Sequence, residues 1–480
     1  VRPTPQQSER LIPMSKPKPA SLTVLGGART VTGSRFLIES DGRRVLVDCG
    51  IFQGLKELRE RNWAPFPVDP SSLDAIVITH AHLDHGGYLP RLVSQGFSGP
   101  VYCTTDTANL LSVVLPDSGR LHEEEAEFVN RVGSTKHRPA LPLYTESDAY
   151  DSLESLHAVD FGASIDVAGA VSIRFDVAGH ILGSATLLCE MPDGVKVRIS
   201  GDLGRPNHPV LLPAQPLGDA DFVLVESTYG DRSHRPEDPV ERLVALVDRT
   251  VARGGVLVIP AFAVDRTEVL LYHLARLSRA GRLPRVPVFV DSPMALAALR
   301  VYRSAISEGR ADIRPELHGD GDLFEVPMLE ENETSEGSKH ISSRMEPAII
   351  IAGAGMATGG RVVHHLKRFL PDRRNAVALV GFQAEGTRGR SLLDGAEVLK
   401  IHGKYVPVRA EICELPGFSV HADREELVGW LRTATREPET VLVVHGEPSA
   451  AESLRRTITS TLDWTAVAPT LGERFTLMRG

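Results

Sequence analysis

Six consecutive residues, His80 to His85 with the sequence HAHLDH, contain three imidazoles and one carboxylate. These groups are ligands for zinc and for its borderline neighbours manganese and iron. Four ligands so close in sequence cannot all reach one ion in good geometry. We expect them to divide between two ions, which can together clamp an oxygen-rich substrate. The alternative is a polar loop that is rich in histidine by chance. Because the chain has only 17 His in 480 residues, three of them at fixed offsets beside an aspartate favour the metal site.

The residues around this motif predict where it lies in the fold. An apolar run over 74–79 precedes it and Gly86-Gly87 follows it. This pattern indicates a buried strand with a tight exit, so the motif is expected on a loop at the carboxyl end of the strand. Four other polar residues also follow β-rich apolar runs: Asp48, Asp202, Glu226 and His445. Because strand ends present chemistry in α/β proteins, we expect all five positions to form one site.

The rest of the chain divides into two regions by its pattern. From residue 21 to about 230 short strands dominate, with one long helix expected around 106–131. Beyond residue 230 helices and strands alternate, which is typical of a parallel sheet with helices on its faces and indicates a separate domain. The polar stretch 310–345 is expected to be the least ordered interior segment. Residues 1–20 carry five prolines and no periodic apolar pattern, so they predict a disordered tail in which Met14 is a candidate start.

Composition narrows the class of protein. The length allows two or three domains, and 42% apolar with 24% charged residues is ordinary for a globular protein. A net charge of −9 argues against a protein that coats nucleic acid through bulk charge. No apolar run is long enough for a membrane span and no signal peptide is apparent at the start. Four scattered cysteines without CxxC spacing are typical of a reducing compartment, so a cytoplasmic location is expected.

Several motifs together resemble a known family. HAHLDH, the AGH around His180, the SGD at Asp202 and the VDCG at Asp48 are similar to the successive motifs of the metallo-β-lactamase fold. ESTYG, FSVHAD and LVVHGE resemble the additional motifs of its β-CASP branch, which contains ribonuclease J and the endonuclease of mRNA 3′-end processing. The resemblance implies an α/β fold, an αββα sandwich over 21–230 and 416–480, with a β-CASP α/β domain inserted at 231–415.

The resemblance also implies roles for individual residues. One zinc would be held by His80, His82 and His180, and a second by Asp84, His85 and His445, with Asp202 bridging the two ions. Asp48 would orient these ligands. A water activated by the two zinc ions would attack phosphorus. Glu226 and His421 would act beside the leaving oxygen, and with Asp84 they complete the expected catalytic group.

The implied activity is hydrolysis of phosphodiester bonds in single-stranded RNA, since His at position 445 is associated with RNA-cutting members. Contacts with RNA are less defined. The glycine-rich segment 353–360 joins a predicted strand to a helix and could hold a phosphate through Gly353, Gly355, Thr358 and Gly359, because glycine permits close approach. The segment lacks the Gly-Lys-Ser/Thr of a P-loop, so nucleotide hydrolysis is not expected. The basic candidates for RNA contact are Arg361, Lys367, Arg368, Arg388 and Arg390.

Three alternatives stay open at this point: a DNA nuclease of the same fold, a small-molecule metallo-hydrolase and a non-catalytic RNA-binding subunit. The inserted domain and the Glu226/His421 pair argue against the small-molecule hydrolase, and the full ligand set argues against the non-catalytic subunit. The pattern does not separate endonuclease from 5′-exonuclease action. It also leaves open the cellular RNA target, a homodimer and a native metal other than zinc.

Overall fold

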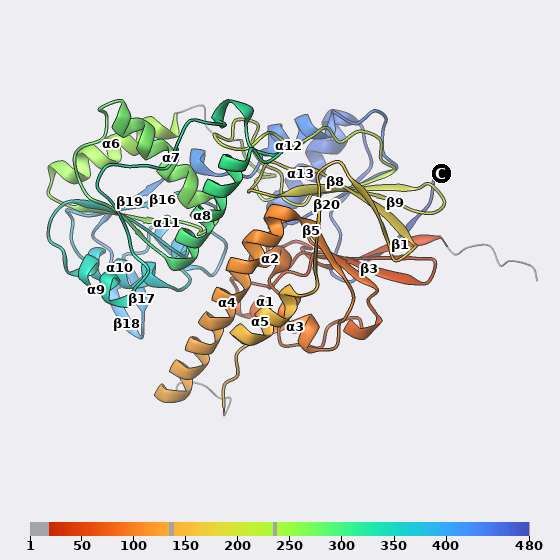
Figure 1. The fold of residues 1–480 in the computed structure, drawn as a ribbon, viewed down its shortest axis with the longest axis horizontal. Coiled ribbons are helices and arrows are strands. Elements are labelled where there is room, and N and C mark those ends of the chain that lie inside the picture. The colour runs from red at the N-terminus through yellow and green to blue at the C-terminus, as the bar shows by residue number, and fades with distance from the viewer. Residues whose placement is uncertain (1–18, 134–138, 234–237, 480) are drawn as a thin grey trace, which may run out of the picture.

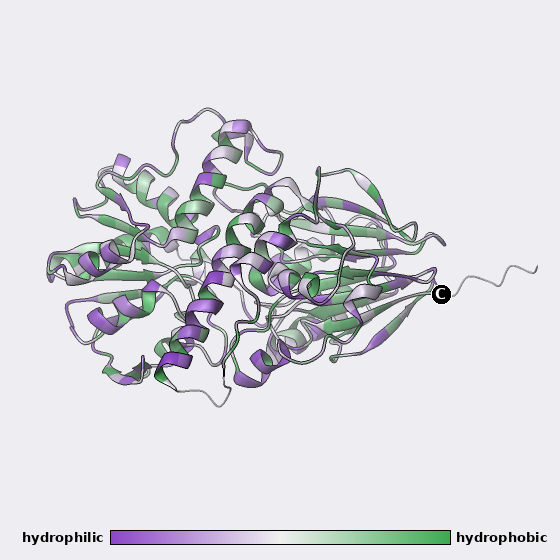
Figure 2. Ribbon diagram, turned by 60° about the horizontal axis from the view of Figure 1, so that its bottom comes forward, coloured by the Kyte–Doolittle hydropathy of each residue, from purple (hydrophilic) through white to green (hydrophobic). Residues whose placement is uncertain are grey.

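A computed structural model describes residues 19–133, 139–233 and 238–479. In this part of the chain two seven-stranded sheets pack face to face and form one lobe of the molecule (Figure 1). The strands of both inner faces are apolar, and their side chains fill a common core between the sheets. Figure 2 shows these strands as mostly hydrophobic ribbons. The core forms because alternate residues of each strand point to the same side.

The first sheet has the strand order β22-β1-β2-β3-β4-β5-β6. The strands β3, β4, β5 and β6 run parallel to one another, while β22, β1 and β2 pair antiparallel. The strands are β1 (Ala20–Gly26), β2 (Arg35–Ser40), β3 (Arg43–Val47), β4 (Ala75–Val77), β5 (Val101–Thr104), β6 (Leu156–Val159) and β22 (Arg474–Leu477).

The second sheet has the order β21-β20-β11-β10-β9-β8-β7, and β10, β11, β20 and β21 are parallel. Strands β20 and β21 come from the C-terminal part of the chain and follow the second lobe in sequence. The strands are β7 (Ser164–Val167), β8 (Val171–Val177), β9 (Ala185–Glu190), β10 (Lys196–Ile199), β11 (Phe222–Glu226), β20 (Thr440–Val444) and β21 (Ala466–Val467).

Helices cover the outer face of each sheet, which gives the αββα layering expected from the sequence. The long helix α4, expected around 106–131, covers the first sheet with α3 and α5, and α12 and α13 cover the second. The helices of this lobe are α1 (Lys56–Arg61), α2 (Leu83–Gly86), α3 (Leu89–Ser94), α4 (Thr105–Val132), α5 (Glu146–Leu153), α12 (Arg424–Leu431) and α13 (Pro448–Leu462).

The second lobe is a six-stranded, fully parallel sheet in the order β14-β13-β15-β12-β16-β19. It follows β11 in the chain and precedes β20, so the chain leaves the sandwich and returns to it. The strands are β12 (Val256–Pro260), β13 (Val288–Asp291), β14 (Leu329–Glu331), β15 (Ala348–Ala352), β16 (Ala376–Leu379) and β19 (Glu411–Glu414).

Helices flank this sheet on both faces, and the short antiparallel hairpin β17-β18 extends from it. Parallel strands need crossover connections, which explains the alternation of helix and strand in the sequence. The elements are α6 (Pro239–Ala252), α7 (Arg266–Arg279), α8 (Pro293–Glu308), α9 (Ser335–Ser343), α10 (Arg361–Phe369), α11 (Arg388–Leu393), β17 (Val398–Ile401) and β18 (Lys404–Pro407).

Two expectations from the sequence need correction. The polar stretch 310–345 is folded, because it supplies the edge strand β14 and the helix α9, whose N-cap Thr334 accepts a hydrogen bond from the Gly337 amide. Ala20 belongs to β1 and pairs with Leu477 of β22, so the predicted tail is shorter than 1–20. Residues 1–18 of that tail, including Met14, lie outside the described residues.

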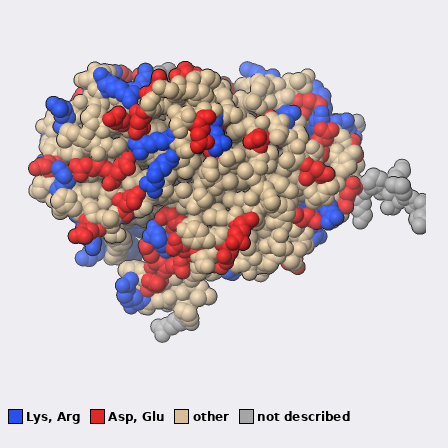
Figure 3. All heavy atoms as spheres, viewed as in Figure 1, with Lys and Arg blue, Asp and Glu red and all other residues tan. Residues whose placement is uncertain are grey.

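On the face shown in Figure 3, basic and acidic side chains are interspersed over both lobes.

Candidate active site

The carboxyl ends of parallel strands bring the predicted site residues together. Asp48 follows β3, His80 follows β4, Asp202 follows β10, and Glu226 ends β11. His445 follows β20, which pairs in parallel with β11. The two sheets of the sandwich therefore present their polar residues at one edge. Asp48 and His445 both have positive φ, 57° and 47°, a conformation that is uncommon for residues other than glycine and that clusters at functional sites.

One glycine explains how two of these loops come so close. A Cβ added at Gly50 would lie 1.7 Å from the Asp84 carbonyl oxygen, so a larger residue there would displace the backbone of the HAHLDH loop. The Cys49 amide beside it donates to the His85 carbonyl at 2.6 Å. The VDCG motif therefore serves as a platform against which the ligand loop is held.

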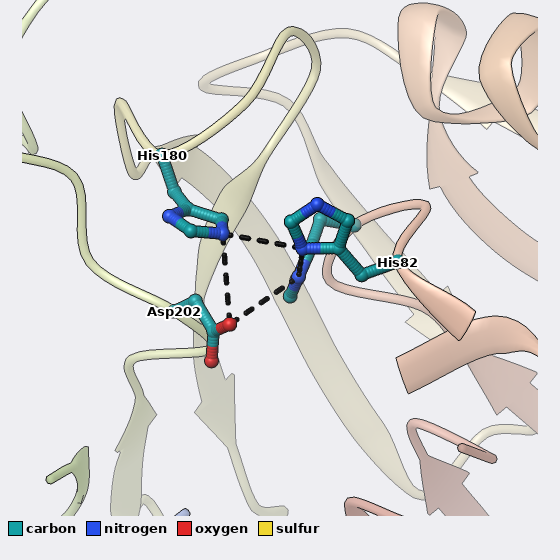
Figure 4. A group of neighbouring side chains, drawn as sticks. His82, His180 and Asp202 are labelled. Atoms are coloured by element: carbon teal, nitrogen blue, oxygen red, sulfur yellow. Dashed lines mark hydrogen bonds and ion pairs between the residues drawn. The ribbon is translucent and has the colours of Figure 1, made fainter. Parts of the chain in front are cut away.

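A first group of side chains consists of His80, His82, His180 and Asp202 (Figure 4). His82 Nδ1 lies 3.1 Å from His80 Nε2 and 3.3 Å from His180 Nε2. Asp202 Oδ2 lies 3.5 Å from His80 Nε2 and 3.6 Å from His180 Nε2. Ligands about 2.0–2.1 Å from one tetrahedral zinc are about 3.3–3.4 Å apart, so these separations fit a single ion.

A second group consists of Asp84, His85 and His445, and it meets the first through Asp202. The other carboxylate oxygen, Asp202 Oδ1, lies 3.2 Å from His85 Nε2 and 3.6 Å from His445 Nε2. His445 Nε2 is 3.8 Å from Asp84 Oδ2. Asp202 therefore presents one oxygen to each group, which is the arrangement of a carboxylate between two ions.

The pKa values of four of the five ligand imidazoles favour metal binding, whereas for His85 the carboxylates of Asp202 and Asp48 outweigh burial and raise the pKa well above its ordinary value. Burial lowers the pKa of His82 to about 3 and that of His445 to about 4, and it holds the pKa of His80 and His180 well below the ordinary value. Neutral imidazole is the form that binds metal. In the described part of the chain, Asp202 Oδ1 and His85 Nε2 are buried and lie 3.2 Å from each other, but neither has a partner in hydrogen-bond geometry. Because such groups are normally satisfied, these atoms fit the role of metal ligands.

Other polar side chains fix the orientation of the ligands. Asp48 Oδ2 lies 2.7 Å from His85 Nδ1 and accepts a hydrogen bond from the Thr79 hydroxyl at 3.0 Å. Ser34 Oγ lies 2.7 Å from His445 Nδ1, which turns the Nε2 atom of that ring toward Asp84 and Asp202. Asp48 was expected in this role. Sequence reasoning missed Ser34 and Thr79, and the sequence carries no signal for Ser34, because it is 411 positions from His445.

Glu226 and His421 form the pair that the sequence predicted. His421 Nδ1 lies 3.3 Å from Glu226 Oε1, and the Leu203 amide donates to the same oxygen at 2.7 Å. Burial alone would lower the pKa of His421, but Glu226 and Asp202 outweigh it and raise that pKa above the ordinary value. The pair is 3.9 Å from the candidate metal ligands, measured from His421 Nδ1 to Asp202 Oδ2, and with Asp202 it forms a third cluster of possible ligand atoms. His421 therefore stands beside these ligands, with its Nδ1 atom facing both Glu226 and Asp202.

The site opens into a cavity between the two lobes. His82, Asp84, Asp202, His421 and His445 line its polar side. The inserted lobe supplies the opposite wall with one buried arginine and several apolar side chains. These residues, which sequence reasoning missed, are Phe262, Arg266, Met294, Met356 and Phe382.

Three of the arginines that were predicted to touch RNA have internal partners. Arg361 Nη1 pairs with Asp291 at 2.7 Å, Arg388 Nη1 donates to the Thr358 carbonyl at 2.8 Å, and Arg390 pairs with Asp394 at 2.9 Å. The segment that contains Gly353, Gly355, Thr358 and Gly359 connects β15 to α10. Lys367 is half-buried and Arg368 is exposed on α10. Contact between these residues and RNA stays a prediction.

Comparison with known proteins defines the class. The model of the metallo-beta-lactamase superfamily matches residues 29–245, the Beta-Casp domain model matches 267–392, and a Zn-dependent metallo-hydrolase RNA specificity domain matches 405–469. Ribonuclease TTHA0252 of Thermus thermophilus is 39% identical over 88% of this chain and 92% of its own length. Transcription termination factor FttA of Methanocaldococcus jannaschii is 32% identical over 91% of this chain and 69% of its own length.

A solved structure supports the fold alone. The crystal structure of a protein of unknown function from Enterococcus faecalis aligns with 96% of this chain and 100% of its own, with a TM-score of 0.54 and 15% identity. Fold, site and matches define a metallo-hydrolase of the metallo-β-lactamase superfamily. Within it, the chain belongs to the β-CASP family, which confirms the predicted resemblance and the predicted fold class. Among the described residues, no helix has the length and apolar character needed to cross a membrane.

Proposed function

We propose that this protein is a ribonuclease that hydrolyses phosphodiester bonds of single-stranded RNA with two zinc ions per chain. The observation that carries the proposal is the position of Asp202, whose two oxygens face two separate ligand groups at the base of one cavity. The name of the relative Ribonuclease TTHA0252 and that of the matched RNA specificity domain support RNA as the substrate.

Seven side chains would hold the two ions, divided as the sequence predicted, with Asp202 shared. Zinc bound there would act as a Lewis acid and would supply an activated water near neutral pH. Asp48 and Ser34 keep the His85 and His445 rings in the orientation that presents Nε2 to the centre. The domain division at 231 and 415 belongs to the same proposal, and it agrees with the chain leaving the sandwich after β11 and returning before β20.

His421 would donate a proton to the departing oxygen. The hydrogen-bonded Glu226 favours the protonated ring, because a carboxylate stabilises a neighbouring imidazolium. Glu226 itself is fixed by the Leu203 amide at 2.7 Å and is fully buried, so it cannot turn away from the ring. In this proposal His421 donates the proton and binds no ion, although Asp202, Glu226 and His421 also have the spacing of metal ligands.

The apolar wall of the cavity supports a single-stranded substrate. Phe262 and Phe382 are half-buried there, and the Phe262 ring centroid lies 6.4 Å from that of His82. Single-stranded nucleic acid is recognised through unstacked bases that rest on aromatic side chains. A base beside the cleaved phosphate could stack on one of these rings, whereas a paired duplex keeps its bases inside.

A cytoplasmic location and a homodimer complete the proposal. All four cysteines are free and three of them are buried, which agrees with a reducing compartment. The homodimer stays a prediction that the mass of the purified protein in solution tests.

The proposed substrate is tested with end-labelled oligonucleotides of one sequence, as single-stranded RNA, single-stranded DNA and duplex RNA. We expect cleavage of the single-stranded RNA at least ten times faster than that of either alternative. Internal fragments would identify an endonuclease and mononucleotides a 5′-exonuclease. Equal rates on RNA and DNA would contradict the proposed preference and favour a DNA nuclease of the same fold.

A further inference from the structure

Arg266, the first residue of α7, is a buried cation without a carboxylate partner in the described part of the chain. It is 4% exposed and lines the cavity that holds His82 and Asp202. Its Nη1 donates to the Phe418 carbonyl, and its Nε has no hydrogen-bond partner among the described residues. A buried charge that is not paired destabilises a fold. The packing of this chain alone therefore gives no reason for an arginine here.

The carboxylate beside it in sequence attracts Arg266 but forms no ion pair with it among the described residues. Asp265 accepts a hydrogen bond from the Tyr302 hydroxyl at 2.7 Å, and His208 Nε2 lies 3.2 Å from the same oxygen. These contacts direct the Asp265 side chain away from an ion pair with Arg266, and no such ion pair occurs in the described residues. Arg266 is therefore a lining residue of the cavity whose charge no described carboxylate pairs.

Two other buried arginines show what a structural role looks like in this fold. Arg198 pairs with Asp176 at 2.7 Å and also donates to the Leu217 carbonyl. Arg35 donates twice to the Gly50 carbonyl, and its guanidinium carbon lies 4.3–5.4 Å from three aromatic ring centroids. Neither lines the cavity. Arg266 has fewer internal contacts than either of them and is the one that meets the site.

We propose that Arg266 binds a phosphate of the substrate chain adjacent to the cleaved bond, so that the substrate supplies the counterion that the fold omits. This inference rests on the proposed function. A guanidinium presents a planar set of donors to phosphate oxygens, and Arg266 lines the cavity while its one printed hydrogen bond, from Nη1 to the Phe418 carbonyl, leaves its charge unpaired. The residue reaches the site from the inserted lobe, so it also gives that lobe a direct part in holding the polyanion.

The first test is stability without substrate, in Arg266→Met and in the matched control Arg35→Met. Methionine keeps much of the volume and removes the charge. We expect the urea midpoint of R266M to equal or exceed that of the wild type, because removing a buried charge without a carboxylate partner offsets the loss of the hydrogen bond to the Phe418 carbonyl. We expect R35M to unfold at lower urea, because it loses two hydrogen bonds and three ring contacts.

The second test is function. We expect kcat/KM for single-stranded RNA to fall about 10- to 100-fold in R266M, the usual size of a lost charge-assisted hydrogen bond. Binding is measured by fluorescence anisotropy in a His421→Ala background, to prevent cleavage. The slope of log affinity against log salt should become shallower by about 0.7, since one phosphate contact fewer releases fewer counterions. Arg266→Lys should keep the slope while losing part of the rate.

Unchanged slopes together with a lower urea midpoint in R266M would overturn the proposal and make Arg266 a structural residue. Failure of both R266M and R266K to fold would have the same meaning. Wild-type cleavage of the same RNA is measured in parallel. Absence of that cleavage would refute the proposed function, while the slopes with RNA and with single-stranded DNA would still decide whether Arg266 contacts phosphate.

Discussion

At the scale of single residues, the site depends on pairs in which one side chain holds another. Asp48 orients His85, Ser34 orients His445 and Glu226 orients His421, at 2.7, 2.7 and 3.3 Å. A polar partner at the Nδ1 atom sets the tautomer and the direction of each ring. Changing the orienting partner should therefore alter a different property from changing the ring itself, and this difference makes the assigned roles testable.

Changing His421→Ala should lower the rate of RNA cleavage by about 10²–10⁴-fold, the usual contribution of general acid catalysis. Zinc content and RNA affinity should stay nearly the same, because His421 donates a proton in our account and binds no ion. Elemental analysis and anisotropy measure these two properties. Loss of a zinc ion in this variant would show that His421 is a ligand and that the assignment of His445 is wrong.

Glu226→Gln should shift the basic limb of the pH–rate profile to lower pH. Burial alone would lower the pKa of His421, whereas the Glu226 carboxylate raises it. The donor must be protonated, so the rate falls as the pH rises through this pKa. Without the carboxylate the pKa is lower and the fall begins earlier. A basic limb at the wild-type position would contradict the coupling.

Ser34→Ala should weaken zinc binding about 10- to 100-fold by freeing the His445 ring, the usual effect of losing such a contact. Competition with a chelator measures the affinity. Ser94→Ala is the control, because that exposed hydroxyl only contacts the Arg91 carbonyl in its own helix. Equal zinc affinity in both variants would remove Ser34 from the account.

At the scale of elements, the sequence predicted the strand ends well and the contacts across the fold poorly. The HAHLDH, SGD and HGE motifs each follow an apolar run, so their place was readable from local pattern. Arg266 was not found, because nothing local distinguishes it from an arginine on a helix surface. Arg361 and Arg390 were predicted to contact RNA, but they form ion pairs with Asp291 and Asp394. Charge alone does not reveal whether a partner is internal.

The loop that carries His180 is braced by the inserted lobe. The Leu182 amide donates to the Tyr302 hydroxyl at 3.0 Å, and the Gly183 amide donates to Asp312 at 2.7 Å. Tyr302→Phe should lower the free energy of unfolding by about 1–3 kcal/mol, because the Leu182 amide and Asp265 lose a buried partner. Tyr405→Phe, at a side chain 75% exposed, should change it little. Equal unfolding midpoints in a urea titration would contradict this brace.

At the scale of the whole molecule, one lobe supplies the candidate metal ligands and the other supplies the opposite wall of the cavity. Figure 1 shows the two lobes side by side. The chain enters and leaves the inserted lobe next to β11 and β20, the two strands that carry Glu226 and His445. The His421 pair lies close to the same junction. Substrate that enters between the lobes would therefore meet metal, proton donor and Arg266 in one place.

The central claim is that seven side chains form a two-ion centre on which RNA cleavage depends. The most direct measurement is the initial rate of RNA cleavage by metal-free protein as zinc is added in known equivalents. Seven ligands exceed what one tetrahedral ion can use, so we predict that full activity requires two zinc ions per chain. Full activity at a single equivalent, with no further zinc bound, would contradict the claim.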